Sequence, residues 1–326
     1  MAVLVTGAAG FIGFHTVRAL LARGEEVVGI DNFNDYYAVA LKRARIAELA
    51  GHKAFRLREL DISDHDAVVR LAAEFKQMRA VVHLAAQPGV RYSLRNPAAY
   101  VASNLAGQVA VLEAARRMER LEHFVYASSS SVYGRSAPLP FSTEDRADRP
   151  VSLYAATKRA DELITHAYCD MHRLPATGLR FFTVYGPWGR PDMATYLFTE
   201  AIFAGRPLRV FNQGRMERDF TYVDDIVDGV LASLGRIPAE RDGVRHALYN
   251  LGHHRTEKLT RFIAVLEAAI GRPAIIEWAP MQPGDVPATF ADIAAARRDF
   301  GFEPKTPIEV GLPRFVDWFR QYHRVA

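Results

Sequence analysis

The sequence predicts an α/β protein built on a Rossmann-type, doubly wound parallel sheet, with a smaller substrate-binding domain toward the C-terminus. Short apolar runs alternate with helical patterns through the first half of the chain. A glycine-rich turn joins the first expected strand to the first expected helix, as in dinucleotide-binding folds. The length of 326 residues, 49% of them hydrophobic, suits one large α/β unit or two domains that share a cleft.

The expected strands of the first half are mostly apolar, which is typical of strands covered on both faces. We expect them at residues 2–7, 26–31, 54–60, 79–85 and 123–129. Helices are expected at 11–24, at 64–77 and from about 98 to 119.

Beyond about residue 181 the pattern changes, because proline and glycine become frequent and the expected elements become shorter. We therefore divide the chain into a cofactor-binding domain over 1–180 and a substrate-binding domain over 181–326. Segments near 217–252 are expected to rejoin the first domain, with a candidate strand at 247–252. The tail after about residue 300 carries no motif.

Composition narrows the function classes. The net charge is +4, and the basic residues form no run, so a nucleic-acid partner is not indicated. The single cysteine, Cys169, excludes intrachain disulfides and cysteine-rich metal sites and favours a reducing compartment. No stretch approaches the roughly 20 apolar residues that a membrane span requires. We therefore expect a cytoplasmic protein with no membrane or metal partner.

Three glycines form the turn after the first strand. Gly7, Gly10 and Gly13 allow a tight turn, a close approach of backbone to a pyrophosphate, and close packing of helix on strand. The phosphates would lie at the helix N-terminus, where unpaired N–H groups favour negative charge. Asp31 ends the second strand, where a carboxylate accepts hydrogen bonds from the adenosine ribose and repels a 2′-phosphate. These features predict NAD rather than NADP.

Two further segments belong to this end of the protein. Asp61 follows the third strand and is a candidate partner for the adenine amino group. Residues 83–87, after the fourth strand, are expected to pass under the adenosine and pyrophosphate. His83 among them is interpreted as a hydrogen-bonded strand histidine rather than a ligand.

The candidate catalytic pair is Tyr154 and Lys158 in the segment YAATK. Their spacing places both side chains on one face of a helix. Free tyrosine, with a pKa of about 10, is a poor base at neutral pH. A nearby ammonium and the positive nicotinamide ring both favour the phenolate form. Ser129, at the end of the fifth strand, is the candidate for the hydroxyl that hydrogen-bonds the substrate beside Tyr154.

At this point the chain is identified as resembling the extended short-chain dehydrogenase/reductase family, and within it the UDP-glucuronate 4-epimerases. The similarity runs from the N-terminus to about residue 293. It is carried, in family order, by TGAAGFIG, DNFNDYY, HLAAQPGVRYS, SSSSVYG, YAATK, RFFTVYGPWGRPDMA, GRMERDFTYVDDIVDGV and PGDVPATFADI. The resemblance implies a Rossmann domain that holds NAD and a smaller domain that holds the UDP-sugar.

The resemblance also assigns residues, with Ser129, Tyr154 and Lys158 as the catalytic set. It places at the cofactor Gly7, Gly10, Phe11, Ile12, Gly13, Asp31, Asn32, Asp61, Ile62, Leu84, Ala85, Ala86, Gln87, Asn104, Tyr154 and Lys158. It places at the substrate Pro88, Arg91, Ser129, Ser130, Ser131, Tyr154, Thr183, Arg190, Arg218 and Asp285. In this scheme Arg218 grips the pyrophosphate and Asp285 lies near the nucleotide ribose. The sugar carboxylate is held by Ser130, Ser131, Thr183 and Arg190.

Three alternatives stay open on the sequence. Some neutral UDP-hexose 4-epimerases of this family have RxxN, and this chain has Thr183 in the position of that asparagine. UDP-glucuronate decarboxylases have a glutamate where this chain has Ser131. A non-catalytic NAD sensor would not need the intact set of Ser129, Tyr154 and Lys158. The resemblance further implies a homodimer formed by helices around 98–119 and 153–172.

Overall fold

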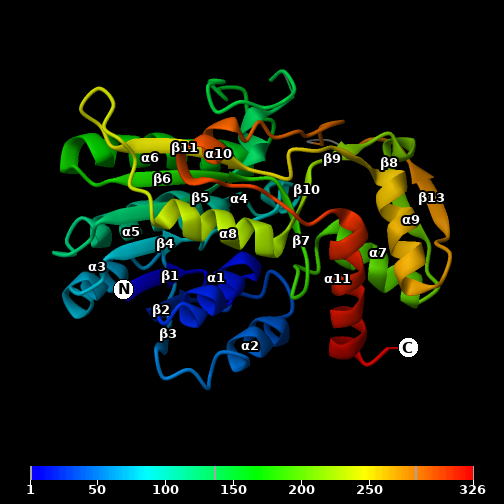
Figure 1. The fold of residues 1–326 in the computed structure, drawn as a ribbon, viewed down its shortest axis with the longest axis horizontal. Coiled ribbons are helices and arrows are strands. Elements are labelled where there is room, and N and C mark those ends of the chain that lie inside the picture. The colour runs from blue at the N-terminus through cyan, green and yellow to red at the C-terminus, as the bar shows by residue number, and fades with distance from the viewer. Residues whose placement is uncertain (1, 136, 283–284, 326) are drawn as a thin grey trace.

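The computed structural model describes residues 2–135, 137–282 and 285–325, and within these residues the largest sheet has seven strands (Figure 1). All of its neighbouring strands pair in parallel, in the order β11-β6-β5-β4-β1-β2-β3. The strands are β1 (Ala2–Thr6), β2 (Glu26–Asp31), β3 (Phe55–Glu59), β4 (Ala80–His83), β5 (His123–Ser129), β6 (Ala176–Phe181) and β11 (His246–Leu251). The fold is therefore of the doubly wound α/β class that the alternating pattern predicts.

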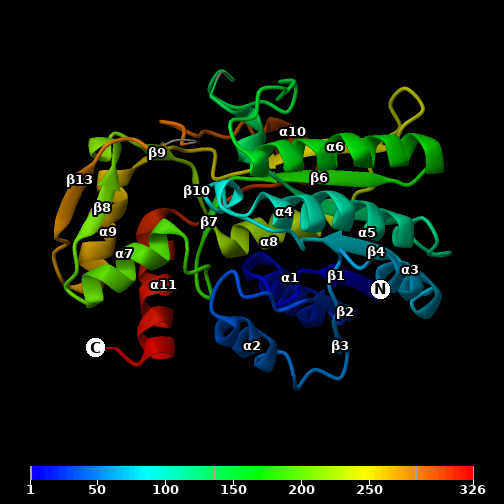
Figure 2. The ribbon, with the colours of Figure 1, turned by 180° about the vertical axis from the view of Figure 1, so that it is seen from behind.

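Helices cover both faces of this sheet. The helices α1 (Phe11–Ala22) and α8 (Val223–Leu234) lie on the face seen in Figure 1. On the opposite face, seen in Figure 2, lie α3 (His65–Glu74), α5 (Gly107–Ala115) and α6 (Leu153–His172). Successive strand residues point to opposite faces, so Val3 and Val5 pack into the core under α1, and Leu4 packs into the core under α5. This two-sided burial explains the mostly apolar strands.

The order of strands reverses between β1 and β4, because the chain runs outward from β1 through β2 and from β4 through β5. A crevice opens at such a point, outside the carboxyl ends of the strands. Here Gly7 has a φ of 71°, and a Cβ on it would lie 2.7 Å from the backbone nitrogen of Ala85. A Cβ on Gly13 would lie 2.0 Å from the carbonyl oxygen of Gly7. The first glycine makes the turn, and the third lets α1 pack against it.

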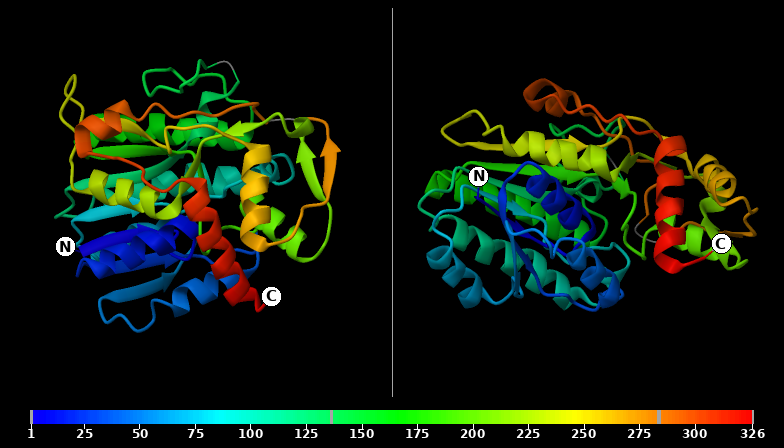
Figure 3. Two further views of the ribbon diagram at one scale, coloured as in Figure 1. Left: turned by 45° about the vertical axis from the view of Figure 1, so that its right-hand side comes forward. Right: turned by 60° about the horizontal axis from the view of Figure 1, so that its bottom comes forward.

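The rest of the chain forms a smaller group beside the carboxyl ends of the sheet, at the right of Figure 1. Its short paired strands are β7 (Thr183–Tyr185) with β10 (Phe220–Tyr222), β8 (Leu208–Phe211) with β13 (Ile276–Ala279), and β9 (Glu217–Arg218) with β12 (Glu257–Lys258). Its helices are α7 (Ala194–Phe203), α9 (Leu259–Ile270) and α11 (Ile308–His323). The last helix packs on α9 and lies between that helix and the large sheet (Figure 3).

Several elements differ from those expected. The helix expected from about 98 to 119 consists of α4 (Pro97–Tyr100), a π-helical segment (Val101–Ala106) and α5, and it ends four residues early. The tail after about residue 300, in which no motif was found, holds α11, and α10 (Ala294–Phe300) comes directly before it; neither helix was expected from the sequence. The strand expected at 247–252 is β11, which pairs with β6 and extends the main sheet. Within the described residues, no helix combines the length and the apolarity that crossing a bilayer demands.

Candidate active site

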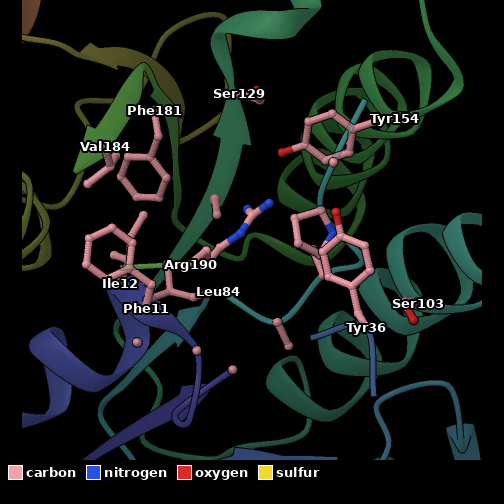
Figure 4. Close-up of a pocket in the computed structure, with 18 of the residues that line it drawn as sticks. Phe11, Ile12, Tyr36, Leu84, Ser103, Ser129, Tyr154, Phe181, Val184 and Arg190 are labelled. Carbon is pink, nitrogen blue, oxygen red and sulfur yellow. The ribbon is translucent and has the colours of Figure 1, made fainter. Parts of the chain in front are cut away.

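A cavity of about 350 Å³ lies at the carboxyl ends of the central strands. Both the large sheet and the smaller group contribute to its walls. The predicted site residues that line it are Gly7, Gly10, Phe11, Ile12, Gly13, Asp31, Asn32, Ile62, Leu84, Ala85, Ala86, Pro88, Ser129, Ser130, Ser131, Tyr154, Lys158, Thr183 and Arg190. Residues from seven separate stretches of sequence therefore meet around one space (Figure 4).

The cofactor end of the cavity is made largely of backbone. Gly10 precedes α1 and no side chain caps that helix, so the N–H groups of its first turn are available to an anion. Asp31 accepts hydrogen bonds from the backbone nitrogens of Ala9 (3.0 Å) and Phe33 (2.9 Å). The carboxylate thus joins the end of β2 to the glycine turn and keeps further lone pairs for ribose hydroxyls. The close backbone approach and the uncapped helix fit the pyrophosphate and ribose of a dinucleotide.

Three predicted cofactor residues do not line the cavity. Asp61 lies behind its wall, where it accepts a hydrogen bond from Asn32 at 2.8 Å. Although burial acts to raise its pKa, hydrogen bonds from Ser63 and Asn32 lower that pKa below the ordinary value. Gln87 donates its backbone N–H to the side chain of Asn104 at 2.7 Å, and both residues are buried. Asn104 therefore fixes the segment after β4 from the π-helical segment.

Asn104 also explains how this segment is tied to the catalytic helix. Its amide donates to the hydroxyl of Thr157 on α6 at 2.9 Å and to the carbonyl of Gln87 at 3.2 Å. The loop that carries Pro88 is thus held at a fixed distance from the turn of α6 that carries Tyr154. This contact positions the site without touching the cavity.

The candidate catalytic pair lies in the first two turns of α6. The Ser152 hydroxyl caps this helix by accepting from the backbone nitrogen of Ala155 at 3.1 Å. Tyr154 follows in the first turn, and Figure 4 shows its hydroxyl directed into the cavity near Ser129 on β5. Lys158 lies one turn further on the same face and is buried. The helix therefore supplies both groups from one rigid surface.

The ammonium of Lys158 has two partners. Its Nζ donates to the carbonyl oxygen of Ala127 at 2.9 Å and to the carboxylate of Asp161 at 3.0 Å. Asp161 is fully buried, and its second oxygen has no hydrogen-bond partner among the described residues. Burial raises the pKa of Asp161 to about 6, and the charge of Lys158 opposes that rise. Sequence reasoning missed Asp161, although its i+3 spacing from Lys158 would have indicated the pair.

The serines at the end of β5 have different partners. Ser128 donates to Glu162 at 2.6 Å, and Glu162 forms a buried bidentate pair with Arg180 at 2.8 and 2.9 Å. This hydroxyl serves the interior of the fold. In contrast, the Ser129 oxygen accepts from the backbone nitrogen of Ser131 at 3.1 Å, which leaves the Ser129 hydroxyl proton free to be donated to a ligand.

The other end of the cavity carries a single guanidinium, that of Arg190, together with Thr183 and Pro88. Arg190 forms a two-point contact with Asp192, Nε to Oδ1 at 3.0 Å and Nη2 to Oδ2 at 2.5 Å. The Tyr36 hydroxyl donates to the same Asp192 carboxylate at 2.9 Å. Tyr36 lines the cavity and Asp192 supports it, yet sequence reasoning assigned neither, because 154 or more residues separate Tyr36 from its two partners.

Arg91, Arg218 and Asp285 lie outside the lining and gather next to it. Arg91 follows the lining residue Val90 and pairs with Asp285 at 3.4 Å. Burial, together with the charge of Arg91, lowers the pKa of the Arg218 guanidinium, while the charge of Asp285 opposes this. Two cations and one carboxylate thus share a small region, as an anion-binding site would require. The preceding motif residues Pro283 and Gly284 lie outside the described residues.

His83 behaves as a structural histidine. Its Nδ1 lies 2.6 Å from the hydroxyl of Thr6 on the neighbouring strand. Burial lowers the pKa of His83 to about 3, and the charge of Lys158 acts in the same direction. The imidazole is therefore neutral at physiological pH.

Comparisons with known proteins agree with this geometry. Residues 3–252 match the model of the NAD dependent epimerase/dehydratase family. The chain belongs to this family. A probable UDP-glucuronate 4-epimerase of Rhizobium meliloti (strain 1021) is 44% identical over 339 residues, which span 100% of this chain and 99% of the relative.

Solved structures of family members extend the comparison. The crystal structure of a Bacillus cereus UDP-glucuronic acid 4-epimerase, in complex with UDP-glucuronic acid and NAD, is similar with a TM-score of 0.90 and 34% identity over 99% of this chain and 100% of the other. A Thermotoga maritima UDP-glucose 4-epimerase, with UDP-glucose, reaches a TM-score of 0.87 at 28% identity over 99% of this chain and 100% of the other. The fold of these epimerases is therefore the fold of this family member.

Proposed function

We propose that this protein is an NAD-dependent 4-epimerase that interconverts UDP-glucuronate and UDP-galacturonate through a transient 4-keto sugar. The observation that carries this proposal is the shared cavity, into which the hydroxyls of Ser129 and Tyr154 and the guanidinium of Arg190 all face. The groups that handle the proton of the C4 hydroxyl and a cation that binds the carboxylate would therefore contact one sugar ring. The UDP-glucuronate 4-epimerases among its relatives support the same substrate.

The cofactor end fits NAD. The uncapped α1 N-terminus and Gly7, Gly10 and Gly13 suit the pyrophosphate, and Asp31 suits a ribose without a 2′-phosphate. When bound, NAD supplies the oxidant that takes the C4 hydride and later returns it to the opposite face. The protein's task is to hold the two reactants face to face and to manage the proton of the C4 hydroxyl.

Tyr154 removes this proton as the general base and returns it after the sugar has turned. Ser129 donates a hydrogen bond to the same oxygen, because its own oxygen is occupied by the Ser131 N–H and its proton is free. Lys158, held by Ala127 and Asp161, provides a positive charge one helical turn from Tyr154 and completes the proposed catalytic set.

The carboxylate of the sugar requires separate control. A 4-keto uronic acid is a β-keto acid and loses CO₂ when the C5–C6 bond aligns with the carbonyl π system. In the proposed site Arg190, Thr183, Ser130 and Ser131 hold the carboxylate charged and out of this alignment. The UDP is held by Arg91, Arg218 and Asp285 and by the loop at Pro88, so that the pyranose can turn while the nucleotide stays bound.

Two other activities of the same family are the competing assignments. A UDP-glucuronate decarboxylase would lose the carboxylate, and a neutral UDP-hexose 4-epimerase would not need Arg190. The hydroxyl of Ser131 and the threonine at 183 favour retention of a carboxylate over either alternative.

The deciding experiment uses the purified protein and UDP-glucuronate without added NAD. NMR of the anomeric and H4 protons distinguishes UDP-galacturonate from a UDP-pentose, and UDP-glucose tested in parallel measures neutral-sugar epimerisation. We expect UDP-galacturonate as the main product. A UDP-pentose as the main product, or faster turnover of UDP-glucose, would reject the assignment.

The proposal includes three broader features. The cofactor domain comprises residues 1–180 with contributions from 217–252, and the substrate domain comprises the rest of 181–326. A homodimer forms through the helices around 98–119 and 153–172, where α6 and the π-helical segment pack together and Leu163, Met171 and Val101 are exposed. A cytoplasmic location agrees with a lone, buried Cys169.

A further inference from the structure

Arg190 belongs to a network that joins the two ends of the cavity. Asp192 accepts from Nε and Nη2 of Arg190, and the Tyr36 hydroxyl donates to the same carboxylate. Tyr36 follows β2 by five residues and so belongs to the segment that begins at Asp31. The side chains of Arg190 and Asp192 are only 21% and 29% exposed, so water competes weakly for this pair.

The loop that carries Arg190 is fastened to the large sheet. The carbonyl of Pro187 lies 2.8 Å from Nε2 of His15 on α1. The carbonyl of Trp188 accepts from Nη2 and Nε of Arg45 at 2.7 and 3.2 Å. Arg45 lies on α2 (Val39–Ala47), is completely buried, and also donates to the carbonyl of Ala9 in the glycine turn at 2.8 Å. The backbone beside Arg190 is therefore fixed, and only its side chain needs to be oriented.

Asp192 provides this orientation and leaves donors free. A guanidinium has five N–H groups, and the two-point contact with Asp192 uses one on Nε and one on Nη2. The three others belong to the end that Figure 4 shows directed into the cavity, between Tyr154 and Tyr36. An arginine without such a partner would sample many rotamers and would lose conformational entropy when it binds a ligand.

We infer that Asp192 and Tyr36 are positioning residues that aim Arg190 at the sugar carboxylate and thereby suppress its loss as CO₂. This inference rests on the proposed function and deepens it. Asp192 acts only through Arg190, and Tyr36 acts through Asp192. Burial acts to raise the pKa of Asp192, but the charge of Arg190 and the hydrogen bonds from Arg190 and Tyr36 lower it, so the carboxylate stays ionised.

The side reaction that this network opposes is decarboxylation of the sugar. In the 4-keto intermediate the C5–C6 bond breaks, its electron pair passes to C5 and the C4 oxygen as an enolate, and C6 leaves as CO₂. A proton then adds to C5 and gives a UDP-4-keto-pentose. The rate depends on how closely the C5–C6 bond parallels the carbonyl π orbitals. A guanidinium aimed from one direction restricts that angle, whereas a freely turning one does not.

The test compares product fractions at equal extent of reaction. We expect the fraction of UDP-pentose and UDP-4-keto-pentose to rise about five- to tenfold in Asp192→Asn and about two- to threefold in Tyr36→Phe, as the loss of ionic and of neutral hydrogen bonds predicts. Asp192→Glu should restore part of the wild-type ratio. The KM for UDP-glucuronate should change much less than it does in Arg190→Ala, because the cation remains in the site.

The chain offers a matched control. Tyr249 donates to Asp299 at 2.9 Å, and Arg298 contacts the same carboxylate at 2.7 and 3.0 Å, which reproduces the tyrosine–aspartate–arginine arrangement away from the cavity lining. Asp299→Asn and Tyr249→Phe should leave the product ratio unchanged. A general loosening of the fold would instead affect both pairs of variants.

A binding measurement supplies a readout without turnover. In a Tyr154→Phe background, calorimetry should show that Asp192→Asn lowers the affinity for UDP-glucuronate less than threefold. The inference is overturned if Asp192→Asn and Tyr36→Phe keep the wild-type product ratio, or if the control pair shifts it equally. Failure of the proposed function is distinguishable, because the wild-type protein would then form no UDP-galacturonate.

Discussion

The two ends of the cavity are built from different parts of the polypeptide. The cofactor end is formed by backbone: a turn with glycines at positions 7, 10 and 13, and the uncapped start of α1. The sugar end is formed by side chains, notably Tyr154 and Arg190, that come from α6 and from the loop after β7. The first end requires glycines, whose lack of a Cβ atom leaves space for the cofactor. The second end requires side chains that are held in a particular direction.

This difference sets how each end responds to change. At the cofactor end an added methyl group collides with backbone that cannot move without disturbing the sheet. At the sugar end a removed atom leaves the fold in place and takes away one chemical step. Substitutions at the cofactor end should therefore lower stability and cofactor binding, whereas substitutions at the sugar end should lower the reaction rate.

The sharpest test of the catalytic end is Tyr154→Phe. It removes the proton acceptor and keeps the ring, so we expect kcat to fall by about 10²- to 10⁴-fold while bound cofactor and thermal stability stay unchanged. Initial rates with UDP-glucuronate measure the loss. Tyr168→Phe, on the same helix but outside the cavity lining, is the matched control. Loss of cofactor in Tyr154→Phe would contradict the division between the two ends.

The opposite behaviour is expected for Gly13→Ala. A Cβ here would lie 2.0 Å from the carbonyl oxygen of Gly7, so we expect loss of copurifying cofactor and a decrease of about 1–3 kcal/mol in the free energy of unfolding. Nucleotide absorbance and denaturant titration measure these effects. Gly51→Ala, with no atom within 4 Å of the added Cβ, should be neutral. Normal cofactor content in Gly13→Ala would show that the turn tolerates displacement.

Asp31 tests whether the cofactor end also depends on a side chain. Asp31→Asn removes the charge that should repel a 2′-phosphate and weakens the acceptor for ribose hydroxyls. We expect NAD affinity to fall about 10-fold and the preference for NAD over NADP to narrow, as measured by fluorescence titration of the reduced cofactors. Asp35→Asn, exposed in the same segment, is the control. An unchanged preference would place the discrimination elsewhere.

The smallest expected effect concerns Asp161. Its carboxylate and the carbonyl oxygen of Ala127 are the two partners of the Lys158 ammonium, so Asp161→Asn removes the charged partner and leaves the other. We expect kcat with UDP-glucuronate to fall about two- to fivefold, because Lys158 is then held less firmly. Asp170→Asn, exposed on the same helix, should leave kcat unchanged. An unchanged kcat in Asp161→Asn would show that Ala127 alone holds Lys158 in place.

The same variant has a consequence for stability. Because burial raises the pKa of Asp161 from 3.8 to about 6, its contribution to the stability of the folded state is fully present below about pH 4 and is lost as the pH rises through about 6. Asp161→Asn should remove this decline, which denaturant titrations across that pH range can measure.

The fold that the sequence predicts is confirmed, and most of the predicted site residues lie around one cavity, because their signals are local. Glycine spacing, the acidic end of β2 and the YAATK segment each require only a few neighbouring residues to be understood. The residues that sequence reasoning missed are those whose role depends on distant partners. The role of Asp192 is evident only from its contacts with Arg190 and with Tyr36, which is 156 residues away in the sequence. The role of Arg45 is likewise not evident from its position in a helix, because it depends on the hydrogen bond to the carbonyl of Trp188.

The sequence by itself determined the α/β class, the dinucleotide turn and the choice of Tyr154 as the candidate base, because each follows from periodicity or spacing along one stretch of chain. Only the tertiary structure decided which serine faces inward to Glu162, which carboxylate accompanies Lys158, and how Arg190 is aimed. The physical reason is that hydrogen bonds and ion pairs depend on distance and direction in space. Chain order does not fix these quantities for residues that are far apart in sequence.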